Sequence, residues 1–152
     1  MRRALWTAAA FLAGLAVGAG TFAAKAAPAR KHVNLPGRAV AAPFSDAVLV
    51  GDTLYLAGRI GFVPGTRQVP ATAEDEARNV LDQFRSVLAE AGMAMDDLVF
   101  VQVFCSDVKL FDTWNKVYPA YFGKELPARA FIGSGPLLFG ARFEMQGIAV
   151  KR

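Results

Sequence analysis

The chain has 152 residues, a length that suits one compact domain. Its single cysteine, Cys105, excludes an intrachain disulfide. Because the sole histidine, His32, has no cysteine or carboxylate partners at metal-ligand spacing, neither a histidine-based catalytic triad nor a transition-metal centre is expected.

The first 26 residues explain an apolar content of 54%, which is above the globular norm. Arg2 and Arg3 precede an uncharged stretch from Ala4 to Ala24, and a small-x-small tripeptide follows at 24–26. This pattern predicts a secretory signal peptide over residues 1–26 and a periplasmic or secreted protein without stable membrane insertion after cleavage. An uncleaved membrane anchor is the alternative, because about 20 apolar residues can span a bilayer.

Removal of residues 1–26 lowers the formal net charge from +4 to +1, because Arg2, Arg3 and Lys25 are lost and no acidic residue is. Nucleic acid is therefore not an expected partner, since binding its phosphates calls for a basic face. Residues 27–42 contain Pro and Gly and lack periodicity, which predicts a linker and leading loop with a solvated basic cluster at 30–32. A single domain is expected over residues 43–152.

The domain begins with two short β-type runs, at 47–50 and 54–57, joined as a hairpin by Gly51 and Asp52. Apolar residues at the i, i+3, i+4, i+7 spacing then predict a helix over 72–91. Thr72 can cap this helix and Gly92 can end it.

The next run, 97–105, is almost continuously apolar, which predicts a central strand covered on both faces with Cys105 buried. A second helix is expected over 110–122, with Pro119 kinking or ending it. Strands are expected at 128–133 and 142–150, and the last strand alternates apolar and polar residues in its first half.

The resulting order, β-β-α-β-α-β-β, predicts an α+β fold in which a mixed sheet carries two helices on one face. Several motifs in this order resemble the RidA/YjgF family. They are Pro43–Ala47, Leu56–Arg59, Asn115 with Tyr118, Tyr121–Phe122, Pro127–Arg129 and Phe143–Val150. The resemblance implies a chorismate-mutase-like fold, a homotrimer and a pocket between adjacent subunits that needs no metal or organic cofactor.

The resemblance also implies hydrolysis of reactive 2-imino or enamine acids to 2-keto acids and ammonia. Arg129 would clamp the carboxylate of the small-molecule substrate, for which its planar fork of donors is suited. Glu144 would hold or deprotonate the attacking water. These two residues are the catalytic candidates. The substrate-binding candidates are Arg129, Asn115, Phe44, Gly58 and Phe131.

The chain departs from the family pattern at three places. Phe44 replaces a tyrosine, Ala57 and Arg59 replace the serine and glutamine of a Ser-Gly-Gln motif, and Ala130-Phe131 replaces a Ser/Thr-Cys pair. Fewer polar partners favour a larger, more apolar acid as the ligand. The loss of these polar groups also leaves open an alternative interpretation, in which the protein is a non-catalytic, trimeric module that binds small acids.

Each candidate also has a plainer interpretation. Arg129 and Glu144 can form an ion pair between subunits, and Asn115 can bond nearby backbone. Arg59 is expected to be a solvated charge beside a turn. The aromatic residues Trp114, Tyr118 and Tyr121 are expected to pack in the core or between subunits. A trimeric chaperone-like protein is a third, weaker interpretation.

Overall fold

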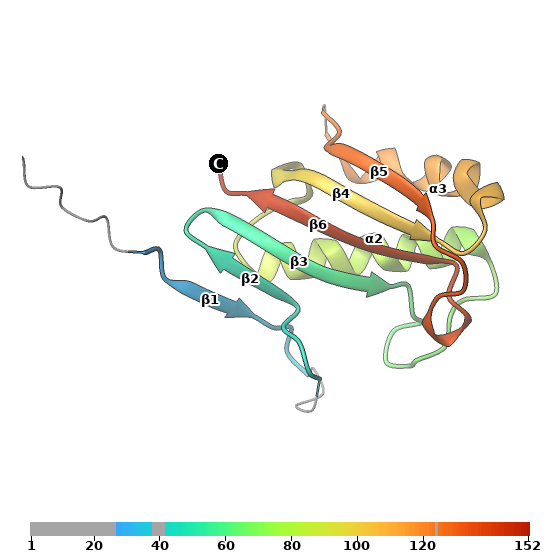
Figure 1. Ribbon diagram of the computed structural model, residues 1–152, viewed down its shortest axis with the longest axis horizontal. Helices are drawn as coiled ribbons and strands as arrows, with labels where there is room; N and C mark the ends of the chain where they lie inside the picture. Colours follow the sequence, from blue (N-terminus) through green and yellow to red (C-terminus); the bar gives the residue numbers. More distant parts are fainter. Residues whose placement is uncertain (1–26, 38–41, 124) are drawn as a thin grey trace, which may run out of the picture.

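The computed structural model describes residues 27–37, 42–123 and 125–152, so the predicted signal peptide lies outside the described residues. One six-stranded sheet carries two helices on the same face (Figure 1). The strands are β1 (Arg30–Val33), β2 (Ala47–Val50), β3 (Thr53–Ile60), β4 (Leu98–Cys105), β5 (Ala128–Gly133) and β6 (Phe143–Val150). The helices are α2 (Ala73–Glu90) and α3 (Phe111–Val117).

The strand order in the sheet is β1-β2-β3-β6-β4-β5. Strands β4 and β5 run parallel, and every other pair is antiparallel. The last strand of the chain is therefore central, between β3 and β4. The predicted α+β class, with a mixed sheet and two helices on one face, is confirmed.

Helix α2 is positioned by its apolar stripe, whose buried side chains run from Ala77 to Leu88. The hydroxyl of Thr72 accepts from the backbone N–H of Asp75 at 3.1 Å, as expected for an N-cap. Gly92, at φ +72°, follows the helix in the left-handed conformation that glycine adopts without strain.

The second helix is shorter than predicted. Helix α3 ends at Val117, and the chain continues as a 3₁₀ turn over Tyr118–Tyr121 with Pro119 near its start. The predicted effect of Pro119 is confirmed, because proline lacks the N–H that an α-helix needs at this point.

Two expectations were wrong. Residues 30–33 form strand β1 instead of loop, and β1 pairs with β2 along its whole length. Strand β4 is not covered on both faces by this chain: its helix-facing residues are buried, whereas Val99 on the bulged start of the strand is 47% exposed. Among the described residues, no helix has the length and apolarity needed to cross a membrane.

A buried ion pair fastens the start of β6 to α2. Glu76 is fully buried, and one of its carboxylate oxygens accepts from the backbone N–H groups of Arg142 and Phe143 at 2.7 and 3.0 Å. The other oxygen accepts from the Arg142 guanidinium at 2.6 Å. That guanidinium also donates to the carbonyl groups of Pro70 and Ala71. One carboxylate thus connects the helix, the start of β6 and the loop before α2.

We expect Glu76→Ala to lower the free energy of unfolding by about 3–5 kcal/mol, because it leaves a partly buried guanidinium and two backbone N–H groups without their acceptor. Glu76→Gln keeps one acceptor oxygen and should cost less. Urea denaturation of the purified protein measures both. Glu90→Ala, an exposed change on the same helix, should stay within about 0.5 kcal/mol of wild type. Equal effects of Glu90→Ala and Glu76→Ala would refute this account.

Candidate functional site

The candidate site lies beside the second half of β3, beyond the point where β2 stops pairing with it. The register of β2 with β3 ends at the pair Ala47–Leu56. The N–H of Ala57 still donates to the carbonyl of Asp46 at 3.0 Å, but beyond it β3 has no strand partner on that side among the described residues. A β-bulge at Ala57 and Gly58 shifts the register between β3 and β6. Bulges at the edge of a sheet change the direction of the neighbouring side chains and often lie next to active sites.

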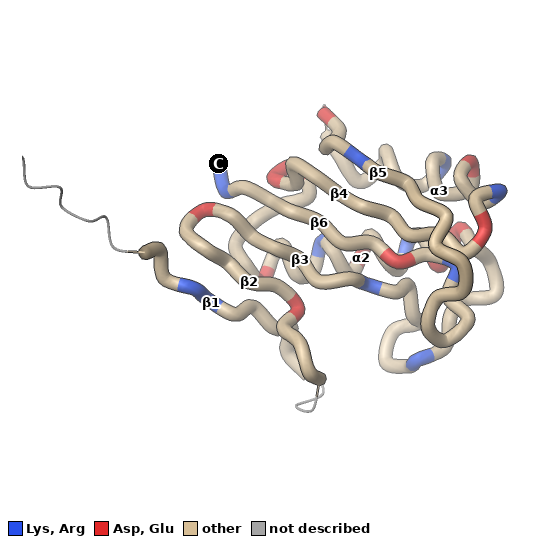
Figure 2. The backbone as a smooth tube through the Cα atoms, in the orientation of Figure 1, with Lys and Arg blue, Asp and Glu red and all other residues tan. Residues whose placement is uncertain are grey.

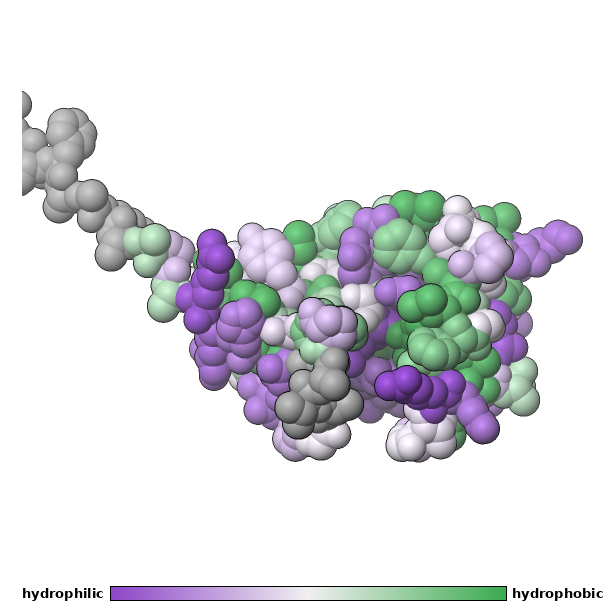
Figure 3. Space-filling view, turned by 60° about the horizontal axis from the view of Figure 1, so that its bottom comes forward, coloured by the Kyte–Doolittle hydropathy of each residue, from purple (hydrophilic) through white to green (hydrophobic). Residues whose placement is uncertain are grey.

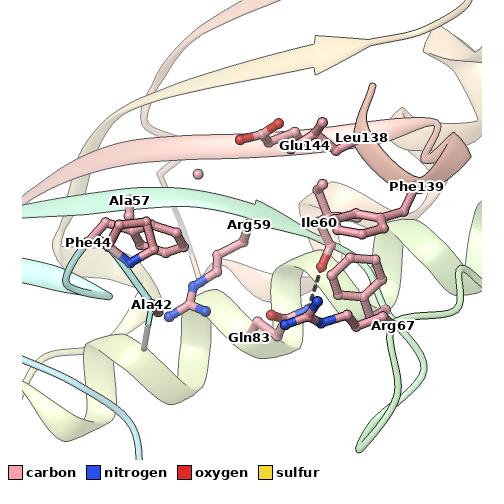
Figure 4. A pocket seen from close by; sticks show the side chains of 13 residues that line it. Ala42, Phe44, Ala57, Arg59, Ile60, Arg67, Gln83, Leu138, Phe139 and Glu144 are labelled. Carbon is pink, nitrogen blue, oxygen red and sulfur yellow. Dashed lines mark hydrogen bonds between the residues drawn. The ribbon is translucent and has the colours of Figure 1, made fainter. Parts of the chain in front are cut away.

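A cavity of about 590 Å³ opens at this edge (Figure 4). It is lined by three of the predicted site residues, namely Phe44, Gly58 and Glu144, which we call the glutamate cluster. Phe44 is 55% exposed, so its ring lies at the mouth of the cavity. The structure therefore brings together one catalytic candidate and two binding candidates.

Gly58 allows the Glu144 carboxylate to lie against the bulge. A Cβ atom at position 58 would be 2.0 Å from Oε1 of Glu144, which is far inside van der Waals contact. Burial in this cavity raises the pKa of the Glu144 carboxyl above its ordinary value. A carboxyl group shifted in this direction is better suited to exchange protons near neutral pH.

Arg59 is not the solvated charge that the sequence suggested. Its side chain is 16% exposed, and its guanidinium forms an ion pair with the buried carboxylate of Asp46 at 2.8 Å. Asp46 also accepts from the N–H of Leu35, and its own N–H donates to Asn34. This network fixes the chain before β2 against the bulge, which positions Phe44.

The other predicted residues lie together elsewhere. Arg129 on β5 donates to Oδ1 of Asn115 on α3 at 2.8 Å. Its guanidinium also lies over the rings of Tyr118, Phe111 and Phe131, at 4.7, 5.7 and 6.0 Å from their centres. We call Asn115, Arg129 and Phe131 the arginine cluster.

The arginine cluster orients a cation without neutralising it. The amide of Asn115 and the aromatic rings carry no formal charge, and among the described residues no carboxylate forms an ion pair with Arg129. Burial raises the pKa of Tyr118 to about 12, although the Arg129 charge opposes the shift, so the ring stays neutral. Among the described residues, no acidic side chain therefore pairs with this guanidinium.

Within one chain the two clusters lie on opposite faces of the sheet. Arg129 is in register with the buried Val101 and contacts α3, whereas Glu144 is in register with Phe104 on the face without helices. Strand β4 separates their strands by about 10 Å. Figure 2 shows how little charge these strands carry: β5 has Arg129, β6 has Glu144, and β4 has no charged residue.

Further residues of the cavity were not predicted. They are Ile60 and Phe62 after the bulge, Arg67 and Gln83, and the pair Leu138 and Phe139 in the loop before β6. The apolar run at 137–139 was a signal in the sequence, but its place depends on the loop conformation. Trp114 and Tyr118 are buried, as core packing requires, and Tyr121 is partly buried against the core. No three metal-ligating side chains gather among the described residues.

The fold and the cavity define an α+β protein with a cavity beside the second half of β3. Over residues 35–151 the chain matches the family described as Endoribonuclease L-PSP, and it belongs to that family, which includes the RidA and YjgF proteins.

Similar proteins of known name support this membership. The chain is 37% identical over 110 residues to the 2-iminobutanoate/2-iminopropanoate deaminase of Bos taurus, covering 72% of this chain and 80% of the relative. It is 32% identical over 112 residues to the mitochondrial protein MMF1 of Saccharomyces cerevisiae, covering 74% and 77%. Homologues with deaminase names thus place this chain in a deaminase-containing family.

Solved structures agree in fold. The YjgF gene product of E. coli is 30% identical with a TM-score of 0.75, covering 80% of this chain and 99% of that chain. RidA from Psychrobacter sp. PAMC 21119 is 27% identical with a TM-score of 0.73, covering 79% and 98%. The chorismate-mutase-like architecture is shared.

The raised pKa of Glu144 gives a pH-dependent prediction. Because the folded pKa exceeds the unfolded one, the folded protein binds more protons between the two values, and stability falls as pH rises through the folded pKa. Glu144→Gln removes this fall. The quantity to compare is the melting temperature of Glu144→Gln minus that of wild type. We expect this difference to be more positive at pH 7 than at pH 4. A relative melting temperature that is unchanged between these pH values would contradict the assignment, and exposed Glu90→Gln is the control.

Proposed function

We propose that the protein is a homotrimeric hydrolase of 2-imino or enamine acids, whose site combines the arginine cluster of one protomer with the glutamate cluster of the next. The observation that carries this proposal is the division of the two clusters. Each holds half of the chemistry, and they face away from each other within a chain. The deaminase names of similar proteins support the same reaction class.

The face of the sheet without helices supports an assembly. Tyr55 is 50% exposed, Val99 is 47% exposed and Val150 is 38% exposed, and these residues belong to β3, β4 and β6. Exposed apolar side chains on neighbouring strands favour contact with another protein surface. A ring of three copies uses a head-to-tail contact, in which two different patches of each chain meet.

The proposed chemistry follows from the two charged groups. The Arg129 guanidinium binds the substrate carboxylate and orients the imine carbon. Glu144 of the adjacent protomer accepts a proton from water as the water oxygen bonds to that carbon. The tetrahedral adduct then loses its C–N bond, and the protons taken from water leave on ammonia. The products are a 2-keto acid and ammonia.

We expect Arg129→Ala to lower kcat/KM for 2-iminopropanoate about 100-fold, because charge-assisted contacts to the carboxylate are lost. Glu144→Gln should cost about 100-fold or more through loss of the base. Ammonia release from enzymatically generated imine measures both rates.

Mixed assemblies test the division directly. When the Arg129→Ala and Glu144→Gln chains are co-expressed at equal levels, roughly one quarter of the interfaces in a ring of three combine both intact groups. We expect about that share of wild-type activity to return. Mixing Arg129→Ala with Arg129→Lys joins no intact pair and serves as the control. No recovery in a verified mixed trimer would refute the shared site.

A non-catalytic module that binds small acids is the second candidate. The buried Asp46–Arg59 ion pair favours it, because this arginine stands where the family motif has an uncharged glutamine and is already paired. Binding of 2-keto acids that depends on Arg129, without ammonia release from any imine, would distinguish the module from the hydrolase.

We also propose that the chain is exported and loses residues 1–26. The uncharged stretch after Arg2 and Arg3 supports this proposal. Mass spectrometry of the protein recovered from its native host should show a chain beginning at Ala27. A full-length chain held in the membrane fraction would favour the uncleaved anchor instead.

A further inference from the structure

The cavity that holds Glu144 has an apolar wall. Phe62, Leu138 and Phe139 line it, and the rings of Phe62 and Phe139 meet edge to face with centres 5.3 Å apart. Leu138 is 69% exposed and Phe139 is 56% exposed, so neither side chain is part of the core. In the view of Figure 3, apolar side chains gather beside a hollow in the surface. We call these three residues the aromatic wall.

The backbone of Phe139 is strained in a way that holds its ring at the cavity. Phe139 has φ +60°, and it is the one residue other than glycine with positive φ in the part of the chain that the structure describes. A bulky side chain is an outlier in this conformation, and such outliers gather at functional sites. A packing role does not account for the strain, because more than half of the side chain is exposed.

Contacts on both sides of Phe139 hold the loop in place. The N–H of Ala141 donates to the carbonyl of Leu138 at 3.1 Å, which closes the turn around Phe139. The next N–H groups, those of Arg142 and Phe143, are held by the Glu76 carboxylate. The aromatic wall is therefore a fixed surface.

Two of the polar side chains around the cavity are held by partners in their own chain. Gln83 donates to the carbonyl of Ile60 at 2.7 Å (Figure 4). Arg59 forms an ion pair with Asp46. Arg67 is the other cation among the described residues that line the cavity. The volume of about 590 Å³ suits a ligand much larger than a three-carbon acid.

We propose that the aromatic wall selects 2-imino acids with an aromatic substituent, as formed from phenylalanine. This inference rests on the proposed hydrolase function. The imine carbon lies near Glu144, and the substituent contacts Phe62 and Phe139 edge to face, the arrangement that aromatic pairs favour. The wall contributes to specificity, whereas Glu144 and Arg129 carry the reaction.

The test compares imines generated from phenylalanine, alanine and glutamate by an amino-acid oxidase. We expect the wild-type kcat/KM to be about 10-fold or more higher for the phenylalanine imine than for the alanine imine. Phe139→Gly and Phe139→Asn both tolerate positive φ, so they remove the ring without adding backbone strain. Both should lower the phenylalanine-to-alanine ratio about 10-fold.

Leu126→Ala is the matched control, because Leu126 is 57% exposed and does not line this cavity. It should leave the ratio unchanged. Equal or better use of the alanine imine by wild type, or an unchanged ratio in both Phe139 variants, would overturn the proposal. A preference for the glutamate imine that is lost in Arg67→Ala would also overturn it, in favour of a second anionic group.

Failure of the hydrolase function is a separate outcome. If no imine is hydrolysed, calorimetric binding of phenylpyruvate and pyruvate tests the aromatic wall alone. Phenylpyruvate should bind about 10-fold more tightly than pyruvate to wild type, and Phe139→Gly should remove the difference. Equal binding of the two acids to wild type would refute the role of the wall.

Discussion

The positions of Glu144 and of the loop that carries Phe139 depend on the buried carboxylate of Glu76. It accepts from the N–H groups of Arg142 and Phe143, which are the last residues before Glu144. Phe143 is thereby directed into the core, and the alternation of the strand sends Glu144 to the opposite face. The same carboxylate binds the Arg142 guanidinium, which donates to the carbonyl groups of Pro70 and Ala71. One ion pair thus ties the end of the loop before α2 to the start of β6. Such a pair is costly to bury, and its value lies in the geometry that it specifies.

The charge distribution on the sheet explains why a single chain is an incomplete catalyst in our proposal. Arg129 is held by Asn115 and three aromatic rings on the helical face, at the edge strand β5. Glu144 lies on the other face, beside the bulge of β3. In the proposed head-to-tail ring, the edge of one copy would meet the open face of the next, which would unite the two groups. Because Arg129 and Glu144 are each oriented by contacts within their own chain, assembly would need little further ordering of these side chains.

Much of the fold was predictable because local patterns and tertiary packing agree. The apolar stripe of α2, the effect of Pro119 and the alternation of β6 were all readable in the sequence. Strand β1 was not, because its sequence, Arg-Lys-His-Val, is mostly exposed and owes its conformation to pairing with β2. The burial of Arg59 was also unreadable, since its partner Asp46 lies 13 positions earlier and meets it through the tertiary fold.

The candidate site shows the same division between residue identity and residue placement. Family motifs identified Glu144 and Gly58, but the bulge explains why they belong together, because a side chain at position 58 would displace the carboxylate. Phe139 belongs to none of the family motifs, and its proposed role depends on a positive φ that no local pattern in the sequence predicts. The bulge and the strained loop both border the cavity that holds this carboxylate. The same cavity therefore has two effects. It buries Glu144, which raises the pKa of that carboxyl, and it provides the apolar wall that would receive a substituent.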